Sequence, residues 1–192
     1  MKKLLLLIII CSPVLAFTQT VLSILPEING IPTYSQVIVI DSSTTQAELY
    51  NRAKIWFVDH YNSAKNVLQM EDKEAGLLAG KGIIPIEFDV KVPSGNDSIT
   101  VRQYFDIYHT IKVYTKKGKY RFEITDLKGT FNYKSIGNFQ QEPMDFPLVN
   151  KGYKAAEYAQ IQVLQETDNA ISQTVESLKK AMQKPITGNA NW

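Results

Sequence analysis

Apolar and polar residues follow a strand-then-helix pattern early in the chain. Residues 34–41 contain four consecutive β-branched residues and lead into a turn-forming cluster, which is typical of a buried strand. Thr45 and Glu48 then have the spacing of a capping box, in which two side chains satisfy free amides at a helix start. A stripe at helical spacing follows, at Leu49, Ala53, Trp56 and His60. The pattern predicts a helix over about 44–62 that packs on a sheet.

Four strands are predicted after this helix. Turn-forming residues separate three strand regions, which cover about 66–72, 77–91 and 99–116. The dipeptide Lys117-Gly118 predicts a tight turn into a partner strand over about 119–133. Gly80 and Gly82 indicate a bulge or the close approach of another part of the chain. Short connections of this kind join antiparallel strands.

A long helix is predicted over about 152–183, because one apolar face recurs there at Ile161, Leu164, Ile171, Val175, Leu178 and Met182. Asp168 falls on the same face, so either the helix breaks there or Asp168 caps its second half. Residues 17–33 lack a sustained period and are interpreted as an extended lead-in, and residues 144–147 as irregular. These patterns predict one domain over 34–184 and a polar tail over 185–192.

Residues 1–16 have the parts of a cleavable signal peptide. Two lysines precede an unbroken apolar run over 4–11, and small residues lead up to Ala16. The run is too short to span a bilayer, which takes about 20 residues. Cys11 follows Ile10, where a lipoprotein signal requires a small residue. We therefore expect an exported protein, periplasmic or extracellular, without a lipid anchor and without a transmembrane segment in the mature chain.

Removal of residues 1–16 would leave a neutral chain without cysteine. The full chain has 21 basic and 19 acidic residues, and two of the basic residues lie in this leader. A neutral protein gains little from the release of counterions by a phosphate backbone, so we expect no nucleic-acid partner. Cys11 is the only cysteine, which excludes a disulfide framework and a thiol-ligated zinc site in the mature chain. Enough residues remain for one domain stabilised by its buried core.

The middle of the chain resembles a known family. The similarity is carried by the strand Val37–Asp41, the helix segment Leu49-Tyr50-Asn51-Arg52-Ala53 with Trp56 and Phe57, the segment 67–72 and the glycine-rich run 76–82. These features are similar to an uncharacterised family of exported proteins from Gram-negative bacteria, catalogued as a domain of unknown function (type 4468) with a TBP-like fold. The resemblance covers residues 34 to about 133. It implies an α+β fold of the order β-α-β(4)-α, with a curved antiparallel sheet packed against two helices on one face, and no activity.

The candidate motifs for chemistry are weak. Residues 76–82 look like a phosphate-binding loop, but they are one residue short between the glycines, lack the magnesium-holding Ser or Thr and lie between strands. His109 alternates with apolar residues along its strand, which predicts a buried, hydrogen-bonded histidine under the helices. His60 ends the stripe of the first helix, where it would pack or offset the charge of the helix end. Two histidines without a spaced third ligand make a weak metal case, so we expect no metal site and no cofactor.

One face of the long predicted strand carries tyrosines between charged residues. Every second residue from 104 to 114 lies opposite the His109 side, and the partner strand should add Lys119, Arg121, Glu123 and Thr125. Tyrosine and arginine are favoured at binding surfaces because they combine a large contact area with a polar tip. A solvated face with cross-strand ion pairs is the alternative. The candidate binding residues are Tyr104, Asp106, Tyr108, Lys112, Tyr114 and Arg121.

The sequence favours a non-enzymatic binding or interaction module of the bacterial cell envelope, whose partner would be an envelope protein or a glycan. The alternative is a carrier of a small apolar ligand held between the sheet and the C-terminal helix. A third possibility is an envelope enzyme whose site is assembled from groups that the sequence does not connect. Two acidic residues could meet in space as a glycosidase-like pair, but scattered surface carboxylates are the default interpretation. The TATA-binding protein holds DNA with basic residues and phenylalanine wedges on its open face. Balanced charges and tyrosines occupy that face here, so the DNA use is not carried over.

Overall fold

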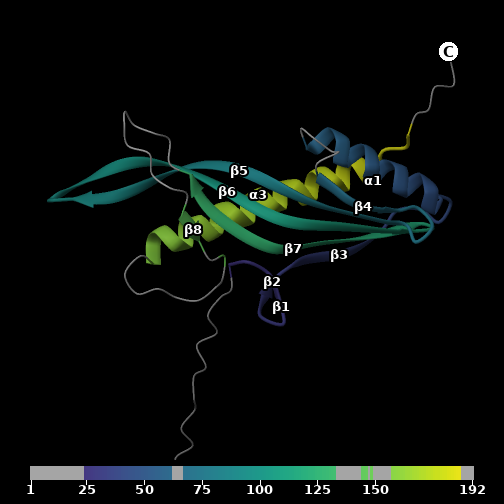
Figure 1. Ribbon diagram of the computed structural model, residues 1–192, viewed down its shortest axis with the longest axis horizontal. Coiled ribbons are helices and arrows are strands. Elements are labelled where there is room, and N and C mark those ends of the chain that lie inside the picture. Colours follow the sequence, from purple (N-terminus) through teal and green to yellow (C-terminus); the bar gives the residue numbers. More distant parts are fainter. Residues whose placement is uncertain (1–23, 62–66, 133–143, 147, 149–156, 187–192) are drawn as a thin grey trace, which may run out of the picture.

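The computed structural model describes residues 24–61, 67–132, 144–146, 148 and 157–186. Its main feature is a long, twisted antiparallel sheet crossed by a long helix (Figure 1). The sheet has the order β3-β7-β6-β5-β4, and a short strand, β8, also pairs with β7. Its strands are β3 (Tyr34–Val39), β4 (Leu68–Asp72), β5 (Leu77–Ser94), β6 (Asp97–Lys116), β7 (Lys119–Asn132) and β8 (Met144–Phe146). The hairpin of β5 and β6 projects beyond the other strands.

Two helices, α1 (Gln46–His60) and α3 (Glu157–Gln183), lie side by side on one face of the sheet. The predicted capping residue is confirmed, because the Thr45 hydroxyl accepts a hydrogen bond from the Glu48 amide. The Glu48 carboxylate pairs with Arg52 one turn later. Arg52 is buried and also donates to the carbonyl of Met182 at the end of α3, at 2.6 Å. Arg52 therefore ties the two helices together.

The helix α3 runs unbroken through Asp168, so the predicted break or second cap there is wrong. The Asp168 carboxylate instead accepts a hydrogen bond of 2.7 Å from the hydroxyl of Tyr34 in β3. Burial, with Asp168 beside it, raises the pKa of Tyr34. This polar pair across the layers explains why an acidic residue can stand on the apolar face of the helix.

Two segments contain strands that the sequence pattern did not indicate. Residues 27–32, within the predicted extended lead-in, form a small hairpin of β1 (Glu27–Ile28) and β2 (Ile31–Pro32). Its turn uses positive φ at Asn29 and Gly30. Residues 144–146 were predicted to be irregular, but they form β8 beside β7. A three-residue strand is too short to show a period, and its pairing with β7 is a long-range contact.

Gly80 and Gly82 allow α1 to approach β5 closely. A Cβ at Gly80 would lie 2.9 Å from the ring of Phe57, and a Cβ at Gly82 would lie 2.5 Å from the ring of Tyr61. The predicted close approach is therefore confirmed. The register shift beside Gly80 is a feature of β4, between Leu68 and Met70.

The candidate functional site is the open face of the sheet

The open face is defined here as the sheet surface turned away from α1 and α3. Along β6 the side chains on the helix side are buried, with Phe105 1% and Ile107 and Ile111 0% exposed. The alternating side chains point the other way. All six candidate binding residues lie on this open face: Tyr104, Asp106, Tyr108, Lys112, Tyr114 and Arg121. The predicted pairing across to β7 is also observed, with Lys112 opposite Glu123 and Tyr114 opposite Arg121.

The centre of the open face is an apolar pair surrounded by charged residues. Tyr108 is 39% exposed, and Ile83 of β5, directly opposite it, is 48% exposed. A hollow of about 530 Å³ lies beside them, and Lys81, Asp126 and Lys128 line it. Exposed apolar side chains framed by charges are the arrangement of a small contact surface.

A bulge in β7 shapes this hollow. Tyr108 pairs with Lys128, whereas Thr110 pairs with Thr125, so two residues of β7, Asp126 and Leu127, stand opposite the single residue His109. Asp126 has a φ of 56°, which only a few non-glycine residues adopt. Bulges locally twist a strand and redirect its side chains. Here the bulge changes which β7 side chains border the centre of the open face.

Tyr114, Arg121 and Glu123 form a second cluster on the same face. The Arg121 guanidinium lies 4.3 Å from the centre of the Tyr114 ring, a cation–π arrangement. Glu123 holds both groups, because it pairs with Arg121 at 3.2 Å and accepts the Tyr114 hydroxyl at 3.3 Å. This cluster borders a hollow of about 340 Å³ lined by Val37, Tyr114, Lys116, Lys119, Tyr120 and Arg121.

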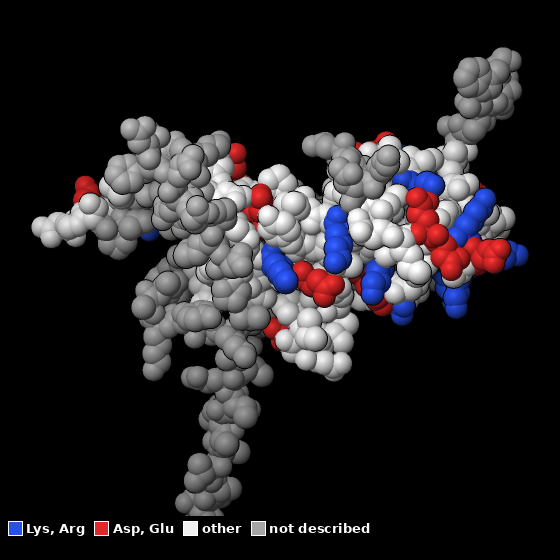
Figure 2. Space-filling view, viewed as in Figure 1, with Lys and Arg blue, Asp and Glu red and all other residues white. Residues whose placement is uncertain are grey.

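Charges of both signs lie close together on the described part of the surface in view (Figure 2). Figure 2 shows lysine and arginine side chains interspersed with aspartate and glutamate on the face in view. On β5 and β6, Arg102 pairs with Asp89 and lies 3.6 Å from Glu87. Exposed pairs of this kind contribute little to stability because solvent screens them. Cross-strand ion pairs, which are typical of an ordinary solvated sheet face, and the exposed Tyr108 are therefore both present on this sheet.

His109 lies on the helix side of the sheet, where the prediction that it is buried is confirmed at 3% exposure. Its Nε2 is 2.7 Å from the hydroxyl of Tyr61, which follows α1. Burial lowers the pKa of His109 from 6.5 to about 4. His60 stacks on Trp56 with ring centres 4.8 Å apart, and burial lowers its pKa as well. Both histidines thus belong to one aromatic cluster at the end of α1.

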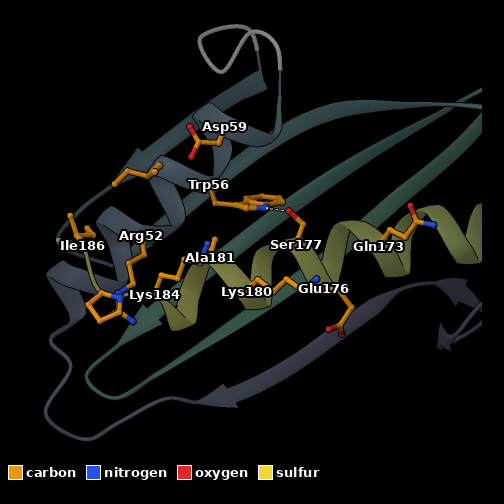
Figure 3. A pocket seen from close by; sticks show the side chains of 12 residues that line it. Arg52, Trp56, Asp59, Gln173, Glu176, Ser177, Lys180, Ala181, Lys184 and Ile186 are labelled. Atoms are coloured by element: carbon orange, nitrogen blue, oxygen red, sulfur yellow. Dashed lines mark hydrogen bonds between the residues drawn. The ribbon is translucent and has the colours of Figure 1, made fainter.

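A further hollow of about 690 Å³ lies between the helices, and Figure 3 shows the side chains that line it. Two of its polar groups already join the helices, because the Trp56 indole nitrogen donates to the Ser177 hydroxyl at 3.1 Å. Charged groups of both signs, including Asp59 and Lys180, stand around it. Across the described residues, no group of three or more His, Cys, Asp or Glu is placed to hold a metal ion.

The space between the sheet and α3 is where the sequence suggested an apolar ligand. Buried side chains from both layers fill it in the described residues, among them Phe105, Ile111, Phe122, Ile124, Leu164, Ile171 and Leu178. This packing does not favour the carrier alternative.

The helices on one face of a curved antiparallel sheet define a TBP-like α+β domain. The chain belongs to the family described as "Domain of unknown function (DUF4468) with TBP-like fold", whose model matches residues 34–130. A DUF4468 family protein from Bacteroides ovatus is similar in structure, with a TM-score of 0.60, 18% identity and coverage of 86% of this chain and 94% of that one. A TBP-like protein from Parabacteroides distasonis has a TM-score of 0.54 and 14% identity, covering 84% and 99%. No curated protein sequence matches the chain.

Three contributors to the open face were not identified from the sequence: Ile83, Lys81 and Lys128. Their own strands gave no signal, because Lys81 lies in the glycine-rich run and Lys128 follows the bulge. The missing information was the register between β5, β6 and β7. A shift of one residue would have turned each of these side chains to the other face.

Proposed function

We propose that this protein is a non-enzymatic binding module of the bacterial cell envelope and that its contact surface is the open face of the sheet. The observation that carries this proposal is the exposed pair of Tyr108 and Ile83 beside a hollow with a charged rim. Both helices in the described part of the chain pack on the other face. The partner is an envelope protein or a glycan, because either can cover an aromatic and aliphatic centre and bond to charged groups around it.

Export is the second part of the proposal, and it rests on the signal-like pattern of residues 1–16. Within the described residues, no helix combines the length and the apolar character needed to cross a membrane. We expect the mature chain to begin near Phe17 or Gln19. N-terminal sequencing of the protein isolated from the native envelope checks this expectation. A retained Met1, or a lipid on Cys11, would show that the leader has been misinterpreted.

Truncation of Tyr108 tests the contact surface. Tyr108→Ala should weaken binding to the native partner by about 2 kcal/mol or more, as central aromatic residues of interfaces do. It should leave the melting temperature nearly unchanged, because the ring is 39% exposed. The measurement is partner recovery from envelope extracts, with each variant's melting temperature determined in parallel.

Val58→Ala is the matched control for this experiment. Val58 is 55% exposed on α1, in the opposite layer, so its truncation removes exposed apolar surface without touching the open face. It should recover the partner as the wild type does. Equal recovery by the Tyr108 variant, or a large drop in its melting temperature, would mean that Tyr108 belongs to a structural face rather than a contact surface.

A further inference from the structure

The strand β3 is an edge of the sheet, and its outer side is unpaired in the described residues. It pairs with β7 alone, in the register that places Val37 opposite Arg121 and Val39 opposite Lys119. The prediction of a buried strand here is wrong, because β3 is an edge strand in which Val37 is 58% and Val39 is 74% exposed. An unpaired strand edge offers a row of main-chain donors and acceptors to any extended chain.

The direction of these main-chain groups follows from two hydrogen bonds. The Ile40 amide donates to the Gly118 carbonyl on the β7 side, whereas the Thr33 amide donates to Pro26 on the other side. Successive residues of a strand point their main-chain groups in alternating directions. The amide and carbonyl groups of Ser35, Val37 and Val39 therefore point outward. The chain itself covers this edge only near Thr33, among the residues that the structure describes.

Nothing within β3 protects this edge. Proteins commonly block an exposed edge with a lysine, a proline or a bulge. The sequence of Tyr34–Val39 contains no charged residue, proline or glycine, and its pairing with β7 runs without a register shift. An unprotected edge of six residues rich in β-branched side chains is well suited to receive an additional strand.

The charges beside the Val37–Val39 end of this edge are mainly basic, whereas Glu123, opposite Ser35, is paired with Arg121. The hollow next to Val37 is lined by Lys116, Lys119 and Arg121 and by no carboxylate. Lys116 and Lys119 stand directly opposite each other, and neither forms an ion pair within the described residues. Opposed like charges repel, and an acidic group between them would remove that repulsion.

We propose that the outer edge of β3 binds an extended acidic segment of another protein by β-strand addition. The segment would exchange main-chain hydrogen bonds with Ser35, Val37 and Val39, and its carboxylates would lie on the open face near Lys116 and Lys119. This inference rests on the proposed binding function and assigns it a partner class, an acidic polypeptide. The added strand would lie two strand spacings, about 9.6 Å, from β7, so a glutamate and a lysine side chain would have to extend toward each other across β3 to meet.

Three synthetic peptides test this proposal on the purified protein. The first is a fluorescein-labelled nonapeptide of alternating glutamate and valine, the second has lysine in place of glutamate, and the third is the acidic peptide N-methylated throughout its central residues. Fluorescence anisotropy should show the acidic peptide binding at least tenfold more tightly than the lysine peptide. The N-methylated peptide should bind at least tenfold more weakly than the unmethylated acidic peptide, because it keeps the charge but lacks the main-chain donors.

Charge reversal at the edge completes the experiment. Lys119→Glu should weaken the acidic peptide about tenfold, whereas Lys180→Glu, on exposed α3 surface, changes the net charge equally and should have little effect. Equal binding of the N-methylated peptide would overturn the proposal, as would equal effects of the two substitutions. Self-association of the protein that the peptide does not disrupt would instead assign the edge to a second copy. If the acidic peptide does not bind but Tyr108→Ala still recovers less of the native partner than the wild type does, the proposed binding function is supported and strand addition at β3 is wrong.

Discussion

Gly129→Ala should lower the free energy of unfolding by about 3 kcal/mol, at the upper end of the usual cost of overpacking a core. The added Cβ would lie 2.0 Å from Cζ of Phe105 and within 2.9 Å of two further ring atoms. The ring cannot easily move away, because it is 1% exposed and packs against Phe131 and Phe146 with ring centres 4.8 and 6.0 Å apart. Urea unfolding of the two proteins measures the difference.

Two comparisons separate this collision from other effects of replacing a glycine. Gly95→Ala forces an alanine into a φ of 62°, but its Cβ would meet nothing within 4 Å, so it should cost only about 1–2 kcal/mol. In a Phe105→Leu background the Gly129→Ala penalty should fall by at least half, because the smaller side chain leaves room for the methyl group. An unchanged penalty in that background would mean that the Phe105 ring is not what excludes a side chain at Gly129.

Local patterns predicted α1, the long C-terminal helix and the strands β4 to β7, because each depends on neighbouring residues. The capping pair at the start of α1, the glycine-containing turn at Lys117-Gly118 and the alternation along β6 are all visible within a few residues. Alternation alone also placed the candidate tyrosines together on one face. What it could not provide was the partner of each residue on the adjacent strand.

Long-range pairing accounts for the features that the sequence did not indicate. Asp168 looked like a break because its partner, Tyr34, lies 134 residues away. Gly129 is an isolated glycine in its strand, and only the position of the Phe105 ring explains it. The hollow at Tyr108 likewise depends on the bulge at Asp126, which sets the register of β7. Each of these contacts joins segments whose separation in sequence leaves no periodic signal.

The buried His109 should make the protein less stable in acid. Its pKa is lowered from 6.5 to about 4 in the folded protein, chiefly because burial disfavours the charged ring. Between these values the unfolded chain binds a proton that the folded protein does not. The contribution of neutral His109 to the free energy of unfolding is therefore present in full above about pH 6.5 and is lost as the pH decreases toward 4. Below about pH 4 the titration of His109 causes no further change. The loss between pH 7.5 and 4.5 should be roughly 2–3 kcal/mol.

Two variants isolate the contribution of His109 from that of the carboxylates, which also titrate in acid. His109→Leu should remain folded at pH 7.5 with a stability change within about 2 kcal/mol, because it fills the site but leaves the Tyr61 hydroxyl without its partner. Its stability should then fall less than that of the wild type between pH 7.5 and 4.5.

His60→Gln is the control at the neighbouring, less buried histidine and should retain most of the acid dependence. Urea unfolding at both pH values measures all three proteins. If the acid dependence of His109→Leu equals that of the wild type, the folded protein accepts a proton at His109 as readily as the unfolded chain does, and its contact with Tyr61 must persist in the charged form.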